Sequence, residues 1–216
     1  SNYFVIPESY AYRLPANLDM AAMAPLLCAG ITTYSPLKKW KVGPGSNVAV
    51  AGLGGLGHMA VKFAVALGAK VTVLSHSDSK ESDARAFGAT DFIDTGKTDW
   101  HLGYQKRFDL ILNTVSAHLD LEPYLSTLAT DGSLIVIGVP SEPFNISAGS
   151  LLDGRRSVSG SLIGGIPETQ EMLDFCGANN IVSEVEVISA DYINKAYDRT
   201  VASDVRYRFV IDCSTF

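Results

Sequence analysis

The chain has 216 residues, of which 47% are hydrophobic and 19% are charged, and its net charge is −6. These values are ordinary for a globular enzyme domain, and the acidic balance gives no electrostatic reason to expect nucleic acid or an anionic membrane as a partner. No apolar run reaches the ~20 residues that a transmembrane helix needs. Three widely spaced cysteines, Cys28, Cys176 and Cys213, argue against a disulfide framework. We therefore expect a protein of the reducing cytoplasm.

The first 18 residues differ in pattern from the rest of the chain. Tyr3–Pro7 predicts a short apolar strand with no obvious partner nearby, followed by an extended connector. Asp19 can cap a helix that begins at Met20. Pro25 should interrupt that helix, and a second helical stretch should then run to Trp40.

From residue 47 onward, predicted strands and helices alternate, which indicates a parallel sheet. We expect strands at 47–51, 70–74, 91–93, 108–113, 133–137, 158–163 and 209–212. We expect helices at 55–67, 78–87, 119–128, 167–177 and 190–202. The fold class is therefore α/β: a doubly wound parallel sheet of the Rossmann type, with about six strands and helices on both faces.

A glycine-rich loop directly follows the first strand of this alternation and leads into a helix. Its residues are Gly52, Leu53, Gly54, Gly55, Leu56 and Gly57. In this motif the first glycine permits a tight turn, the second lets the backbone approach a pyrophosphate, and the third lets the helix lie close to the strand. The helix N-terminus adds N–H groups and a positive dipole end. An ordinary glycine-rich turn can match the motif, but the strand, loop, helix and second strand together indicate a nicotinamide dinucleotide site.

The end of the second strand bears on which dinucleotide is bound. NAD enzymes usually place an acidic residue about 20 residues past the loop to hold the ribose 2′-hydroxyl, and Ser75 stands there instead. Ser75 and Ser77 can donate hydrogen bonds to a 2′-phosphate, Lys80 supplies positive charge, and His76 can stack or donate. We therefore predict NADP rather than NAD. Asp78 turned inward would favour NAD, and the same residues could instead only cap the next helix.

Further loops at the carboxyl ends of strands should line the cofactor cleft. They are Asn113–Ser116, Gly138–Pro140 and Gly160–Gly164. Their small or apolar residues and backbone groups suit one face and the carboxamide of a nicotinamide ring. Each of them alone is a weak signal, because a loop of small residues more often has no ligand.

Together these residues resemble the medium-chain, zinc-dependent alcohol dehydrogenase superfamily, and within it the cinnamyl-alcohol-dehydrogenase-like and YahK-type aldehyde reductases. The resemblance lies in residues 24–37, the glycine loop with His58, residues 160–173 and residues 206–212. It implies that Cys28 is a catalytic-zinc ligand. Together with the cleft loops, the resemblance implies a set of contacts near the nicotinamide: Thr32, Thr114, Val115, Gly138, Val139, Ser161, Leu162 and Ile163. It implies that Arg208 contacts the pyrophosphate.

The other zinc-site motifs of that superfamily belong to a catalytic domain that precedes the Rossmann domain. The four histidines of this chain, none of them in a Gly-His-Glu motif, are His58, His76, His101 and His118. A catalytic zinc needs three protein ligands and an open position. We therefore expect Cys28 to carry no metal in this chain alone, or to be only a small buried side chain, and no catalytic residue is assigned.

The resemblance also implies how the chain is organised. Residues 1–18 are expected to be a remnant of a GroES-like catalytic domain, 19–200 the Rossmann domain, and 201–216 the last sheet strand and the return toward the catalytic domain. Ser1-Asn2 in place of an initiator Met suggests a piece of a longer protein. We expect that protein to pair into homodimers through the strand near Val158–Leu162.

The expected function of the longer protein is hydride transfer between NADP(H) and a primary alcohol or aldehyde, with zinc as Lewis acid. The present chain alone should bind NADP and lack turnover. Two alternatives stay open: a stand-alone dinucleotide-binding module without catalysis, and half of a zinc-free quinone or enoyl reductase. The sequence does not reveal which aldehyde or alcohol is the substrate.

Overall fold

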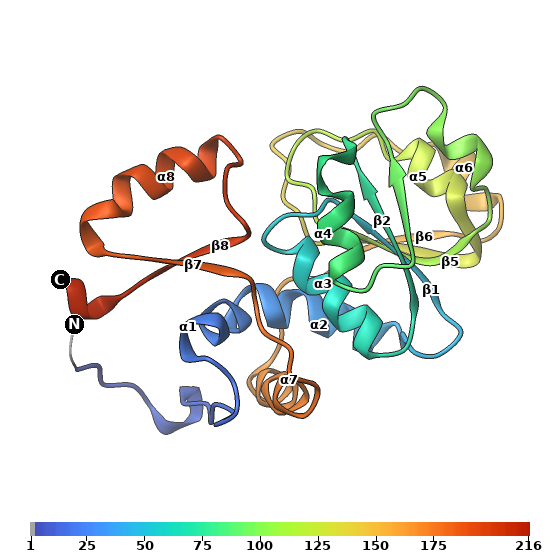
Figure 1. The fold of residues 1–216 in the computed structure, drawn as a ribbon. Coiled ribbons are helices and arrows are strands. Elements are labelled where there is room, and N and C mark those ends of the chain that lie inside the picture. The colour runs from blue at the N-terminus through green and yellow to red at the C-terminus, as the bar shows by residue number, and fades with distance from the viewer. Residues whose placement is uncertain (1–2) are drawn as a thin grey trace. The chain divides into compact units, whose positions relative to one another are not determined.

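The computed structural model describes residues 3–216, so the Ser1-Asn2 start that suggests a longer protein lies outside the described residues. The chain divides into two compact units (Figure 1), one formed by Thr32–Ile163 and the other by Ser1–Ile31 together with Gly164–Phe216. These units reflect packing in space. The predicted boundaries after residues 18 and 200 concern the domain organisation of a longer protein, and they remain a prediction.

The unit Thr32–Ile163 is built on a six-stranded sheet in which every neighbouring pair of strands is parallel. Its strands are β1 (Asn47–Ala51), β2 (Lys70–Ser75), β3 (Asp91–Asp94), β4 (Phe108–Asn113), β5 (Leu128–Val136) and β6 (Ser157–Gly160). Their spatial order, β3-β2-β1-β4-β5-β6, is the order of the doubly wound dinucleotide-binding fold. The predicted Rossmann architecture is thereby confirmed.

Helices connect these parallel strands. They are α3 (Gly57–Ala66), the 3-10 turn η3 (Asp78–Lys80), α4 (Glu81–Ala86), η4 (Trp100–Gly103), α5 (Glu122–Thr127) and α6 (Ala148–Leu152). The chain moves outward from β1 through β2 to β3, and in the opposite direction from β4 to β5. Because such crossovers are right-handed, α3 and α4 lie on one face of the sheet and α5 lies on the other.

The centre of this sheet is apolar because it is covered on both faces. Val48, Val50 and Ile111 are fully buried, and so is Phe63 of α3. Strands buried on both faces become continuous apolar runs rather than alternating ones. The short run that precedes the glycine loop is therefore the sequence signature of a central strand.

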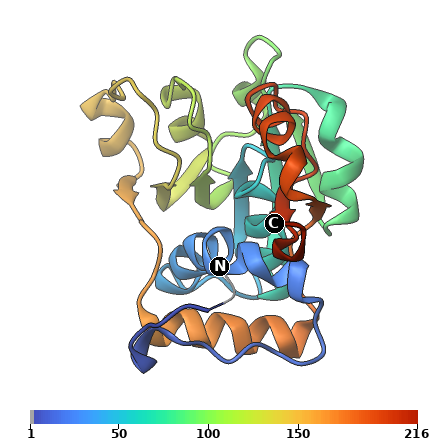
Figure 2. The same ribbon diagram turned by 90° about the vertical axis from the view of Figure 1, so that its left-hand side faces the viewer.

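The second unit holds the two ends of the chain. Its elements are η1 (Glu8–Tyr10), α1 (Met20–Met23), η2 (Ala24–Leu27), the start of α2 (Ala29–Lys39), α7 (Ile166–Asn179), β7 (Val185–Ile188), η5 (Ala190–Tyr192), α8 (Ile193–Val201), β8 (Arg208–Ile211) and η6 (Cys213–Thr215). The Asp19 carboxylate caps α1 by accepting a hydrogen bond from the Ala22 N–H, 2.9 Å away. The N-terminal segment runs beside α7 (Figure 2), where the Asn17 amide donates to the Gly177 carbonyl at 3.0 Å.

Within residues 3–216 no single helix is long and apolar enough to cross a bilayer. Two consecutive helical segments, Met20–Leu27 and Ala29–Lys39, meet that requirement of length and composition only when they are counted together, and a bend separates them.

Three strand predictions were wrong. Tyr3–Pro7 forms no strand, and Tyr3, Phe4 and Val5 are almost fully exposed. The strand at 209–212 exists as β8 but pairs in parallel with β7 in a separate two-stranded sheet, not with the main sheet. β7 was not predicted: it is only four residues long, and its partner β8 is distant in sequence. β6 ends at Gly160, so residues 161–163 form a loop.

Candidate dinucleotide site

The loops after β1, β2, β4, β5 and β6 carry most of the residues predicted to bind a cofactor. Because the strands are all parallel, their carboxyl ends share one edge of the sheet. The chain leaves β1 and β4 in opposite directions, and ligands of this fold bind in the crevice at that switch point. Thr32 is the one predicted contact of this unit outside these loops; it lies in α2 and is buried.

The backbone of the glycine loop folds tightly on itself. Gly52 has a φ of +87°, a conformation that favours glycine, and its N–H donates to the Leu74 carbonyl of β2 at 2.8 Å. A Cβ at Gly57 would lie 2.0 Å from the Gly52 carbonyl oxygen, so no larger residue fits there. A Cβ at Gly54, in contrast, would meet no protein atom within 4 Å. Protein atoms therefore fill the space beside Gly57, whereas the space beside Gly54 is free of protein atoms.

The loops after β1, β4 and β5 touch one another. The Thr114 hydroxyl donates to the Ala51 carbonyl at 2.9 Å and lies 2.9 Å from where a Cβ of Gly52 would stand. A Cβ at Gly138 would lie 2.2 Å from the Val115 carbonyl oxygen. Glycine is therefore needed at Gly52 and Gly138 to let these loops approach, and the contact unites Thr114, Val115 and Gly138 with the glycine loop.

The end of β2 presents a polar group of residues beside that loop. Ser75 and Lys80 are half-buried, and His76 and Ser77 are exposed, as is Asp78. The Lys80 ammonium donates to the Leu53 carbonyl at 2.8 Å. This bond places the predicted 2′-phosphate residue Lys80 in direct contact with the predicted pyrophosphate loop.

An open pocket of about 470 Å³ lies between the ends of β5 and β6. It is lined by Val136–Pro140 and Gly160–Leu162, which brings together the predicted contacts Gly138, Val139, Ser161 and Leu162. Val139 and Leu162 are 75% and 77% exposed, so apolar surface is available to a flat ring. Ile163 follows the pocket with a φ of +44°, a strained conformation for a β-branched residue.

Cys28 and Arg208 belong to the other compact unit. Cys28 ends η2 as an exposed free thiol. Arg208 opens β8, and its buried Nε has no hydrogen-bond partner among residues 3–216. In that described part of the chain, no three His, Cys, Asp or Glu side chains lie together as a metal site. The residues present therefore do not by themselves fit a catalytic zinc.

Two further polar side chains of the site, His58 of the family resemblance and Asn113 of a predicted cleft loop, had no individual role predicted. His58 and Asn113 are both fully buried, and the Asn113 Oδ1 accepts a hydrogen bond from the Val115 N–H at 3.1 Å. The Nδ2 of Asn113 is one of the few buried side-chain nitrogens with no partner in the described chain. In the sequence, the signal for such residues is a polar side chain at the end of an apolar strand, as for Asn113, or directly after the glycine loop, as for His58. The fold buries both positions.

Comparison with known proteins agrees with this geometry. The chain is 55% identical over 215 residues to NADP-dependent alcohol dehydrogenase C 1 of Mycolicibacterium smegmatis, covering 100% of this chain and 62% of that protein. It is 47% identical to the aldehyde reductase YahK of Escherichia coli, again covering 100% of this chain and 62% of the relative. The chain thus spans about 62% of the length of these relatives.

Solved structures give the same result. The cinnamyl alcohol dehydrogenase SbCAD4 of Sorghum bicolor matches with a TM-score of 0.94 and 40% identity, over 97% of this chain and 60% of that one. The enzyme CAD of Helicobacter pylori, in complex with NADP(H), matches with a TM-score of 0.87 and 41% identity, over 96% and 59%. A family model described as zinc-binding dehydrogenase matches residues 55–178, more than half of the chain. The chain belongs to the zinc-binding dehydrogenase family.

Proposed function

We propose that the unit Thr32–Ile163 binds NADP(H). The observation that carries this proposal is the contact between a glycine loop that is open at Gly54 and the strand end at Ser75, Ser77 and Lys80, where Ser75 stands in the place of the usual acidic residue. An acidic residue in place of Ser75 would repel a 2′-phosphate, whereas hydroxyls and an ammonium group attract it. The names of the M. smegmatis relative and of the H. pylori complex support the same cofactor.

Each part of the cofactor then has its own residues. The N–H groups of the glycine loop and the N-terminus of α3, which no side chain caps, hold the pyrophosphate. Ser75, His76, Ser77 and Lys80 hold the 2′-phosphate. The nicotinamide half lies against Thr114, Val115, Gly138, Val139, Ser161, Leu162 and Ile163, and Thr32 and Arg208 add contacts to the ring and the pyrophosphate. When bound, the nicotinamide supplies or accepts a hydride.

We further propose that the whole protein, in the cytoplasm, is a zinc-dependent alcohol dehydrogenase or aldehyde reductase acting on a small-molecule alcohol or aldehyde. Cys28 would supply one zinc ligand, and at least one of the other two must come from outside residues 3–216, because no group of three metal-binding side chains exists within them. The present chain should therefore bind NADPH without turnover. Benzaldehyde reduction with NADPH by this chain would contradict that part of the proposal.

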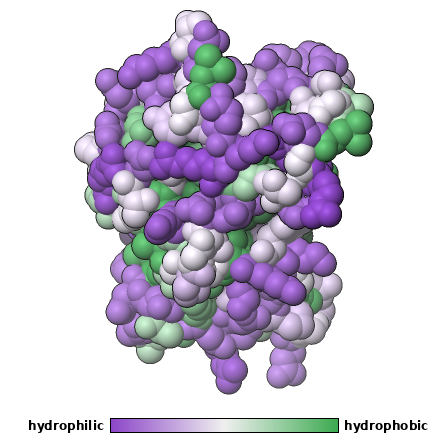
Figure 3. Space-filling view, turned by 90° about the vertical axis from the view of Figure 1, so that its right-hand side faces the viewer, coloured by the Kyte–Doolittle hydropathy of each residue, from purple (hydrophilic) through white to green (hydrophobic). Residues whose placement is uncertain are grey.

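Homodimer formation through β6 is also proposed. β6 is the edge of the main sheet, with β5 on one side only, and exposed edges of this kind readily pair with another chain. Exposed apolar Leu162 follows β6 in sequence, and exposed Val139 lines the same pocket. The face in Figure 3 is mostly hydrophilic, with apolar side chains in several separate patches. Light scattering tests this: a mass of 23.1 kDa at every concentration would contradict it.

A fluorescence titration with NADPH tests the proposal for the cofactor. We expect saturable binding that competes with NADP⁺, and Lys80→Met should weaken NADPH more than NADH. No binding at millimolar NADPH would contradict the proposal.

A further inference from the structure

Three successive carbonyl oxygens of the glycine loop each meet a polar side chain from a different element. The Thr114 hydroxyl, after β4, lies 3.2 Å from the Gly52 carbonyl oxygen. The Lys80 ammonium, in η3, lies 2.8 Å from that of Leu53, and His58 Nδ1, in α3, lies 3.1 Å from that of Gly54. The backbone of the loop is therefore held from three directions.

The planar peptide bond turns these contacts into control of the N–H groups. In a trans peptide, the carbonyl of one residue and the N–H of the next point in opposite directions. Fixing the carbonyls of residues 52–54 therefore directs the N–H groups of residues 53–55 away from the three side chains. A concave run of successive backbone N–H groups forms a site for an anion, so holding the carbonyls restrains the groups from which such a site is built. Without such restraint, a loop with glycine at 52, 54, 55 and 57 would sample many backbone orientations.

His58 is the most constrained of the three side chains. It is fully buried, and its backbone N–H also donates to the Gly54 carbonyl, at 3.0 Å. Since a carbonyl oxygen can only accept, the contact at Nδ1 requires that this nitrogen carry a proton. The Phe87 ring packs at 6.0 Å between centroids and limits rotation of the imidazole. The side chain is thus fixed toward the loop and shielded from any ligand.

We propose that Thr114, Lys80 and His58 are positioning residues that hold the glycine loop in its phosphate-binding conformation before the cofactor arrives. His58 acts only through the loop, because it has no exposed surface with which to touch the cofactor. For Thr114 and Lys80 this role comes in addition to their proposed contacts with the cofactor. The inference rests on the proposed function of the loop in binding NADP(H).

The test uses substitutions that move a single donor. Asn places its amide N–H near the position of Nδ1, whereas Gln places it farther out and Leu has none. His58→Asn should bind NADPH within about threefold of wild type, and His58→Gln and His58→Leu should bind at least about tenfold more weakly. Adenosine 2′-monophosphate, which has the 2′-phosphate but no pyrophosphate, should bind all of them equally. Thermal unfolding without ligand identifies the folded variants.

The outcomes separate a positioning role from a structural one. Unchanged NADPH affinity in folded His58→Gln, or equal losses for NADPH and adenosine 2′-monophosphate, would overturn the inference. If the His58 variants do not fold, hydrogen exchange of the loop amides at residues 53–55, measured without ligand, provides the second test: it should be faster in Thr114→Val than in wild type, and equal rates would overturn the inference. NADPH binding by neither wild type nor variants would overturn the proposed function and the inference with it.

Discussion

Two glycines of the loop are required for different reasons. At Gly57 the Gly52 carbonyl oxygen fills the space that a side chain would need, at 2.0 Å from a Cβ. At Gly54 the space is open for at least 4 Å. The fold therefore demands glycine at residue 57, whereas only a closely approaching ligand demands it at residue 54.

This difference predicts two distinct variants. Gly54→Ala should leave the free energy of unfolding unchanged or raise it by up to ~1 kcal/mol, and should weaken NADPH binding at least about tenfold. Gly57→Ala should lower stability and binding together, because the loop must open. Gly103→Ala, also in open space, is the control: it should change stability within the same range and leave NADPH binding unchanged. Urea unfolding and NADPH titration measure both quantities; wild-type affinity in Gly54→Ala would contradict the account of the loop.

The three cysteines predict a second residue-level result. Burial raises the pKa of Cys176 to about 12, while Cys28 and Cys213 are exposed. A thiol reagent at pH 8 should label two thiols in the native protein and the third only after unfolding. Since the unfolded thiol ionises near its ordinary pKa of 9, native stability should fall as the pH rises from 9 toward 12. Rapid labelling of all three thiols would show that Cys176 is not buried.

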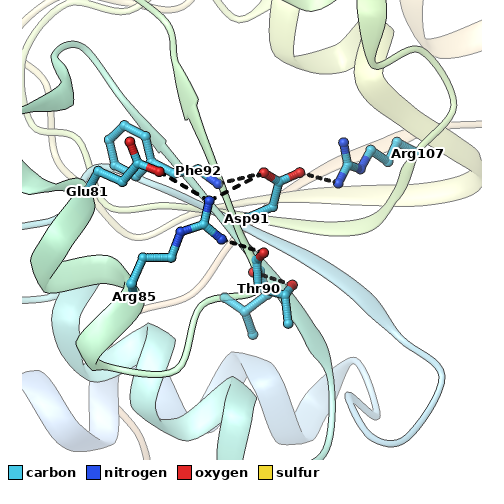
Figure 4. Close-up of polar contacts among 7 residues, drawn as sticks. Glu81, Arg85, Thr90, Asp91, Phe92 and Arg107 are labelled. Atoms are coloured by element: carbon cyan, nitrogen blue, oxygen red, sulfur yellow. Dashed lines mark hydrogen bonds and ion pairs between the residues drawn. The ribbon is translucent and has the colours of Figure 1, made fainter.

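Among the elements, β3 is the edge strand at the other side of the sheet, and arginines hold its start (Figure 4). The Asp91 carboxylate accepts a hydrogen bond from Arg107 at 2.6 Å and lies 3.9 Å from the Arg85 guanidinium. Arg85 also donates to the Thr90 carbonyl and forms an ion pair with Glu81 at 3.1 Å. The cluster joins α4, β3 and the start of β4. It lies at the amino ends of the strands, whereas the glycine loop lies at the carboxyl ends.

Substitution at this cluster should therefore affect stability only. The side chains are about one-third to one-half exposed, so Asp91→Asn should cost no more than ~1 kcal/mol. The loss should shrink in high salt, which screens exposed charges. Urea unfolding at two salt concentrations and an NADPH titration measure these effects. A change in NADPH affinity above about threefold would show that the edge strand influences the site after all.

The small β7–β8 sheet contains the clearest acid-sensitive pair. Hydrogen bonds from Arg199, at 2.8 and 3.1 Å, lower the pKa of Glu186, and the Arg206 N–H also donates to it. Since the unfolded carboxyl titrates near its ordinary 4.5, this stabilisation is present above pH 4.5 and is lost as the pH falls through the lower native pKa.

Glu186→Gln should therefore unfold less steeply on acidification below pH 4.5 than wild type. Asp198→Asn, an exposed carboxylate of α8 for which no such contact is seen, serves as the control. Thermal unfolding midpoints between pH 3 and 6, about the range in which carboxylates titrate, measure the effect. Identical pH profiles for Glu186→Gln and wild type would contradict it.

For the whole molecule, the sequence pattern predicts the main sheet well. Its central strands β1, β2 and β4 are largely apolar runs separated by turns, and the glycine loop fixes the position of β1. The β7–β8 pair could not be predicted, because parallel pairing of two short strands depends on contacts between distant residues. The individual roles of His58 and Asn113 could not be predicted for the same reason: they come from burial against loops that are remote in sequence or folded back on the helix.

The proposed zinc ligand and most of the proposed cofactor contacts belong to different compact units of the molecule. Every predicted cofactor contact except Arg208 lies in the unit Thr32–Ile163, whereas Cys28 lies in the other unit. Because the chain spans about 62% of its relatives' length, the further zinc ligands are expected in the remaining part of the whole protein. We therefore propose that cofactor binding is the property that this chain displays by itself.

The most direct test of the account is the ratio of the dissociation constants for NADPH and NADH, measured by fluorescence titration of the wild-type protein. The hydroxyl and ammonium groups at the end of β2, tied to the glycine loop through Lys80, predict that NADPH binds at least about tenfold more tightly. Equal affinity, or tighter binding of NADH, would contradict it.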